Sequence, residues 1–88
     1  MALTIKSARA LRDGGIDATA ALNEALKDVL LDLPPEKHKE FKFAIGRAIA
    51  AVLDETVNPA VRAFPELEPD EATWIAVAKG SAAKRASK

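Results

Sequence analysis

The sequence predicts an all-α fold: a small bundle of four to five helices around a long central helix. Hydrophobic residues make up 49% of the 88 positions, and alanine, which has the highest helix propensity, is the commonest residue. No stretch of useful length alternates between apolar and polar residues, as a half-buried strand would. Glycine and proline recur along the chain, and each place where they break the helical pattern is expected to separate two helices.

The first half of the chain predicts two short helices. Thr4 is a suitable N-cap for a helix that runs from Ile5 to about Arg12, and Gly14-Gly15 is expected to end it. Asp17 is then the expected cap of a second helix, from Ala18 to about Leu31. Its apolar residues follow the 3.6-residue period, and its polar side carries an acidic stripe at Glu24, Asp28 and Asp32. That stripe is interpreted as a solvated face, with a site for a cation or a basic partner as the alternative.

The central helix is predicted to run from Pro35 to Val57. Leu33-Pro34-Pro35 breaks the chain, because residues before proline avoid helical geometry and proline is favoured at the first helical position. Asn58-Pro59 is expected to end this helix and to begin a short one as far as Phe64. A proline-rich connector follows, and a last helix is expected from Asp70 to about Lys79, closed by Gly80.

The expected domain organisation is a single helical domain of residues 1–79 followed by a flexible basic tail, residues 80–88. The tail SAAKRASK contains only alanine as apolar material, so it cannot bury a face and disorder is predicted. No stretch reaches the roughly 20 apolar residues of a membrane span, and no signal peptide is recognisable, so a cytoplasmic location is the expectation.

The central helix is predicted to have two apolar faces. One is an ordinary core stripe, formed by Phe41, Ala44, Ile45, Ala48, Ile49 and Val52. The second apolar face, which is the candidate interface, is formed by Phe43, Gly46, Ala50, Leu53 and Val57. Either the shorter helices of the chain cover this second face, or it packs against a second copy or another protein.

Catalytic and cofactor chemistry is not indicated. The chain has no cysteine, and its single histidine, His38, cannot supply a multi-histidine metal site. No phosphate-binding glycine loop occurs, and no serine lies in the context of a nucleophile elbow. A site for a hard cation, formed by acidic residues on the connector from Glu66 to Glu71, is kept as an alternative. We therefore expect no enzyme activity, no cofactor, no metal and no small-molecule ligand.

The predicted function is that of a non-enzymatic protein-interaction module, either a homodimer or a protein that docks on another protein. The alternative is a small nucleic-acid-associated protein, because basic residues cluster from Lys37 to Arg47 and in the tail. The possible phosphate contacts of the tail are Lys79, Lys84, Arg85 and Lys88. Zero net charge and the lack of aromatic residues among the basic positions of the tail argue against this alternative.

Overall fold

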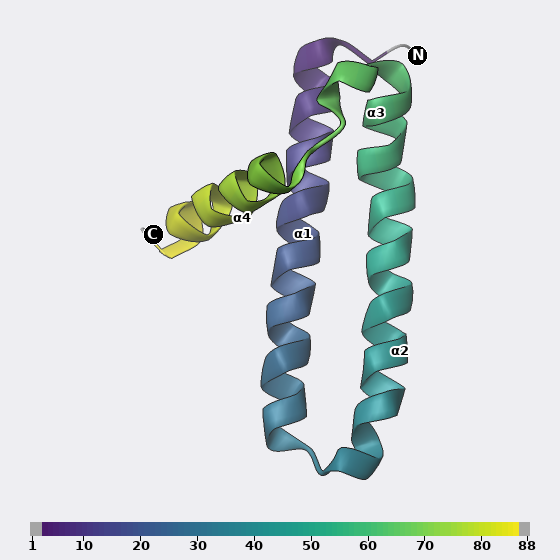
Figure 1. The fold of residues 1–88 in the computed structure, drawn as a ribbon, viewed down its shortest axis with the longest axis vertical. Coiled ribbons are helices and arrows are strands. Elements are labelled where there is room, and N and C mark those ends of the chain that lie inside the picture. The colour runs from purple at the N-terminus through teal and green to yellow at the C-terminus, as the bar shows by residue number, and fades with distance from the viewer. Residues whose placement is uncertain (1–2, 87–88) are drawn as a thin grey trace.

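Helices are the only regular secondary structure in the described part of the chain, which forms a long antiparallel hairpin with one further helix at its side (Figure 1). The computed structural model describes residues 3–86, and of the side chains beyond Gly80 only that of Ala83. The elements are α1 (Ile5–Asp32), α2 (Pro35–Val52), the π-helix η1 (Leu53–Val57), α3 (Asn58–Ala63), the 3₁₀-helix η2 (Pro65–Leu67) and α4 (Glu71–Ala86). Because α2, η1 and α3 follow one another without a gap, they form one rod that runs back along α1.

The all-α class is confirmed, but the bundle of four to five helices around a central one is not. The described chain forms three helical rods, and the two long ones lie side by side, so that neither is central (Figure 1). Two of the predicted helix starts are confirmed by their geometry. Thr4 Oγ1 accepts a hydrogen bond from the backbone N–H of Ser7 at 3.1 Å, and Pro35 is the first residue of α2.

The predicted break at Gly14-Gly15 is wrong, since α1 runs through both glycines for 28 residues. Neither has a positive φ, so neither uses the backbone freedom that would end a helix. Gly15 is buried against the second rod, where an added Cβ would overlap Thr56 Oγ1 and lie 2.9 Å from Val57 Cγ2. Gly15 is therefore the place where the two rods approach closely, and Asp17 lies inside α1 instead of capping a second helix.

The predicted end at Asn58-Pro59 is also wrong. A proline inside an α-helix lacks an N–H, and its ring crowds the carbonyl group four residues earlier. Here the preceding turn is a π-helix, in which the N–H of Asn58 reaches back five residues to the carbonyl oxygen of Leu53. The wider turn makes room for Pro59, so the rod continues to Ala63.

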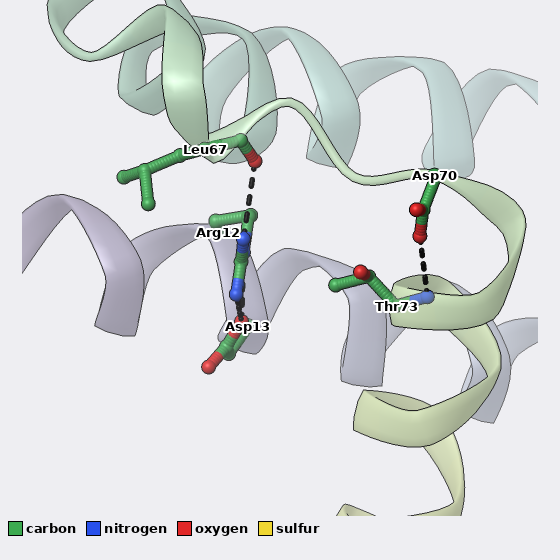
Figure 2. Close-up of polar contacts among 5 residues, drawn as sticks. All are labelled: Arg12, Asp13, Leu67, Asp70 and Thr73. Carbon is green, nitrogen blue, oxygen red and sulfur yellow. Dashed lines mark hydrogen bonds and ion pairs between the residues drawn. The ribbon is translucent and has the colours of Figure 1, made fainter.

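The last helix begins one residue later than predicted and does not end at Gly80. Asp70 precedes α4, and its carboxylate accepts a hydrogen bond from the backbone N–H of Thr73 at 2.7 Å, as an N-cap does (Figure 2). The helix continues through Gly80, whose φ is not positive, as far as Ala86. Residues 80–86 of the predicted tail are thus helical, and Ser87 and Lys88 lie outside the described residues.

The core lies at one end of the hairpin, where the N-terminal half of α1 meets η1, α3 and the connector. The described residues that are buried are Ala8, Gly15, Ile16, Thr19, Val57, Ala60 and Leu67. Arg12 fastens the connector to this end, because its guanidinium donates to the carbonyl oxygen of Leu67 at 3.1 Å and pairs with Asp13 at 2.8 Å (Figure 2). From residue 20 to residue 56, by contrast, no position is buried.

Candidate interaction surface

The outer half of the hairpin, residues 20–56, is an apolar seam that the described chain does not cover. The apolar side chains that face each other across the seam are only half-buried, whereas seam residues in a finished bundle would be buried on every side. They are Leu22, Leu26, Val29 and Leu30 on α1, and Ala44, Ile45, Ala48, Ile49 and Val52 on α2. Phe41, which was predicted to belong to the core stripe, is exposed because it lies near the hairpin tip, the turn at Leu33 and Pro34.

The residues of the predicted second apolar face differ in exposure: some are open to solvent and others belong to the core. Phe43 is 59% exposed, and Gly46 and Ala50 are exposed as well. A Cβ added to Gly46 would meet no atom within 4 Å. Leu53 is half-buried, and Val57 is buried where η1 contacts α1. The tip-proximal part of this face is therefore open, and its far end belongs to the core.

The most exposed large apolar side chain on α1 is that of Leu31, which was predicted only as the approximate end of a helix. It is 81% exposed. Leu31 follows Asp28 by three residues and Glu24 by seven, so the three share one side of α1. We call Glu24, Asp28 and Leu31 the acidic face of α1. Its signal in the sequence is a large apolar residue within the acidic stripe.

The open part of α2 is rimmed by charges of the opposite sign. Lys39 precedes Phe43 by four residues, and its Nζ lies 5.9 Å from the centre of the Phe43 ring. Lys42 continues the same basic rim, and Gly46 and Ala50 extend the apolar strip away from the tip. We call Lys39, Lys42, Phe43, Gly46 and Ala50 the Phe43 face.

The two faces do not pair with each other within the chain. In the described residues 20–56, no carboxylate lies within 4.0 Å of a lysine or arginine nitrogen. On α1, residues 20–32 carry three acidic residues and one lysine, whereas α2 carries four basic and two acidic residues. In the open half, α1 therefore carries a net negative charge and α2 a net positive one, but Asp54 and Glu55 in η1 offset the charge of α2, so that residues 35–56 of the second rod are neutral.

The pocket around His38 is a surface groove formed by a single helix. It has a volume of about 540 Å³ and is lined by Pro35, His38, Lys39, Lys42 and Phe43, all from α2. His38 Nε2 lies 2.8 Å from the carbonyl oxygen of Leu33, and because a carbonyl only accepts, Nε2 carries the proton. The ring thus ties the first turns of α2 to the end of α1. No carboxylate or hydroxyl group lines this groove beside His38, so the groove offers the imidazole no side-chain partner for acid–base catalysis.

The basic residues singled out for phosphate contact do not form one built site. Lys79 is exposed on α4, the side chains of Lys84 and Arg85 are not described, and Lys88 lies outside the described residues. Lys39 and Lys42 share one side of α2, whereas Lys37 and Arg47 are exposed on other sides of it. Among the described residues, no three histidine, aspartate or glutamate side chains are grouped as a metal site would require.

The carboxylate of Asp70, at the end of the connector, interacts with the first turn of α4. Hydrogen bonds from the backbone and the side chain of Thr73 lower the pKa of Asp70 below its ordinary value of 3.8, which is the behaviour of a helix cap.

Across the described residues, no helix is both long enough and apolar enough to cross a membrane. In comparisons with known proteins, the chain matches no protein-family profile, no curated protein and no solved structure.

Proposed function

We propose that this protein is a non-enzymatic helical interaction module whose open half is covered by self-association. The observation that carries the proposal is the run of residues 20–56, in which two apolar helix faces meet and no position is buried. A helix with an apolar face is stabilised in water mainly by burying that face, so an uncovered seam of this length favours association. The predicted interface residues Phe43, Gly46 and Ala50 lie in the same half of the molecule.

The exposed area supports this proposal quantitatively. A compact monomer of 9.4 kDa has an accessible surface of about 5,000 Å² by the usual scaling with mass. This chain exposes 6267 Å², so the excess is roughly 1,250 Å². Two copies that hid this excess would bury about 2,500 Å², which lies in the range of obligate homodimers.

The shape of the chain agrees with its area. The Cα radius of gyration is 14.7 Å, whereas a compact chain of 88 residues has one of about 12 Å. The longest dimension of 45 Å is about twice the shortest, 22 Å. A second hairpin against the first would thicken the molecule along its thin direction and leave its length unchanged.

The experiment that tests the proposal is a measurement of mass in solution, combined with one charge introduced on the Phe43 face. We expect a dimer at micromolar concentration by light scattering or sedimentation. Phe43→Asp removes about 2 kcal/mol of apolar burial from each copy and should raise the dissociation constant at least 100-fold, while far-UV circular dichroism keeps its helical signal.

The matched control is Ala10→Asp, which adds the same charge at an exposed position of α1 beside the covered core. It should leave the mass unchanged. A wild-type protein that stays monomeric at several hundred micromolar contradicts self-association. A loss of helicity in Phe43→Asp would instead assign Phe43 to the packing of the hairpin itself.

A further inference from the structure

Resting on the proposed self-association, we infer that α4 is an arm that the two copies exchange. The C-terminal half of this helix, residues 79–86, is called the α4 arm below. It docks on the acidic face of α1 in the second copy, and the second copy returns the same contact. The occupant of the acidic face is thus a second copy of this chain.

The helix α4 projects from the hairpin and has little to pack on. Its main contact is α1, which it leaves on the side that faces away from the second rod (Figure 1). The described residues of the arm are exposed, and the half-buried residues of α4 are confined to its first half: Thr73, Trp74, Val77 and Ala78. A helix of 16 residues is marginal in water unless it packs, so the arm gains stability from a docking surface.

The acidic face of α1 lies on the same edge of the hairpin. Glu24 and Asp28 are each two residues from the seam residue Leu26, which places them roughly 160° from it around the helix. Leu31 lies five residues from Leu26, or roughly 140° around the helix. The face therefore points away from the second rod, as α4 does. Leu31 is 81% exposed, so the face and the arm are both uncovered within one chain.

The arm and the acidic face carry opposite charges. Residues 20–32 of α1 hold three acidic residues and one lysine, which gives a net charge of −2. The one acidic residue of α4, Glu71, is in its first turn, and the arm holds three basic residues, Lys79, Lys84 and Arg85, so that α4 has a net charge of +2. Because residues 35–56 of the second rod are neutral, charge complementarity selects α1 as the surface for the arm.

The dimensions of the two surfaces also agree. The arm extends eight residues beyond Ala78, or roughly 12 Å, which is the width of one helix with its side chains. The acidic face spans seven residues from Glu24 to Leu31, or roughly 10 Å, which matches the width of a helix that crosses it. Residues 80–83 of the arm are a glycine, a serine and two alanines, and such small residues leave room for a large side chain such as that of Leu31.

Exchange of the arm agrees with burial of the two open seams against each other. When two hairpins stack about a two-fold axis perpendicular to the rods, the α1 helices of both copies lie on the same edge. Both arms leave from that edge. The arms then bring positive charge beside two negative segments of α1, which would otherwise repel each other.

The test mixes two full-length variants. The acidic-arm variant carries Lys84→Glu and Arg85→Glu, and the basic-face variant carries Glu24→Lys and Asp28→Lys. In a homodimer of either variant both arm contacts join like charges, so each variant should raise the dissociation constant at least tenfold in sedimentation. In a mixed dimer both contacts join opposite charges. An equimolar mixture should therefore form a heterodimer at least tenfold tighter than either homodimer, and native mass spectrometry separates the three species by mass.

The matched control reverses two basic residues outside the open half. Lys6→Glu with Arg9→Glu changes exposed residues of α1 and alters the net charge as much as the acidic-arm variant does. It should shift the dissociation constant less than threefold. Formation of the heterodimer also shows that both variants fold. Should charge reversal in the arm lower the helical signal, Lys84→Gln with Arg85→Gln should still weaken the dimer about threefold.

The outcomes separate the exchange of the arm from the association itself. A wild-type protein that stays monomeric overturns both. A wild-type dimer whose dissociation constant is unchanged in the acidic-arm variant leaves the self-association standing and overturns the exchange. If both variants bind weakly and their mixture forms no tighter heterodimer, the arm docks on α1 of its own chain, and the exchange is overturned in that case too.

Discussion

Replacing Gly15 by alanine should destabilise the protein, although the same change one residue earlier should stabilise it. Both glycines lie inside α1, where glycine is disfavoured relative to alanine by about 0.5–1 kcal/mol. Gly14 has no atom within 4 Å of the position of an added Cβ. Gly14→Ala should therefore raise the free energy of unfolding by roughly this amount.

At Gly15 the same gain is opposed by a collision between the rods. The new methyl group would overlap Thr56 Oγ1 and lie 2.9 Å from both Thr56 Cβ and Val57 Cγ2. These atoms lie close to the backbone of η1 and cannot swing away as the end of a long side chain can. The two rods therefore have to separate by nearly 1 Å before the new methyl group is at an ordinary contact distance. Overpacking of this kind costs typically 1–3 kcal/mol. After the gain in helix propensity, a net loss of about 1 kcal/mol is expected, and the two variants should differ by roughly 2 kcal/mol.

Thermal unfolding followed by circular dichroism can measure this difference. For a domain of this size, 2 kcal/mol corresponds to a separation of about 8–16 °C between the two midpoints. The wild type and both variants must be compared at one protein concentration, since association would stabilise each of them. If Gly15→Ala unfolds at the same temperature as Gly14→Ala, or above it, the close approach of α1 and η1 is not the reason for glycine at position 15.

Three further changes probe the polar contacts. Arg12→Ala removes the donor to the carbonyl of Leu67 from a side chain that is only 11% exposed, and it should cost about 1–2 kcal/mol in urea unfolding, whereas exposed Arg9→Ala should cost less than 0.5 kcal/mol. Thr4→Ala removes the cap of α1 and should cost about 1 kcal/mol, and Thr4→Ser should recover most of it. The folded-state pKa of Asp70 is lowered, so its contribution to α4 is present above pH 3.8 and is lost as the pH falls through the lower folded value. Fluorescence of Trp74, the single tryptophan, should report this loss in the wild type but not in Asp70→Ser, which caps without a titrating group.

The features that sequence reasoning predicted correctly are those decided within one turn of helix. Thr4 and Pro35 mark helix starts because a cap hydroxyl and a proline ring act on their own neighbouring residues. Asp70 was expected in the first turn of the last helix, and it lies immediately before α4 as its cap. The helical class followed from composition, which sums many such local preferences.

The predicted breaks failed because contacts distant in sequence decided them. Gly14-Gly15 can end a helix, but contact with η1 holds Gly15 in helical geometry from the other rod. Asn58-Pro59 ends most helices, but the π-turn before Pro59 removes the steric reason to stop. Neither the rod opposite a glycine nor the width of the turn before a proline is visible in the local sequence.

The candidate surface was predicted in part for the same reason. Periodicity assigned Phe43, Gly46 and Ala50 to a second side of the helix, and all three are exposed. The same periodicity included Val57, which is buried, because the helical phase continues past the point where the core begins. Leu31 was missed because it lies among acidic residues on a side of α1 that the pattern marks as polar.

The two failed breaks and the open half of the hairpin have one cause. With both breaks absent, the chain uses 28 residues in α1 and a further 18, 5 and 6 residues in the rod of α2, η1 and α3. Among the described residues, only the connector and α4 remain to cover this pair of rods, and they meet α1 at the end that holds Gly15 and Leu67. Shorter helices separated at Gly14 and Pro59 could have folded back over the seam. Because the rods are continuous, the described residues leave the open half of the hairpin uncovered, and a second copy supplies the missing layer in the proposed dimer.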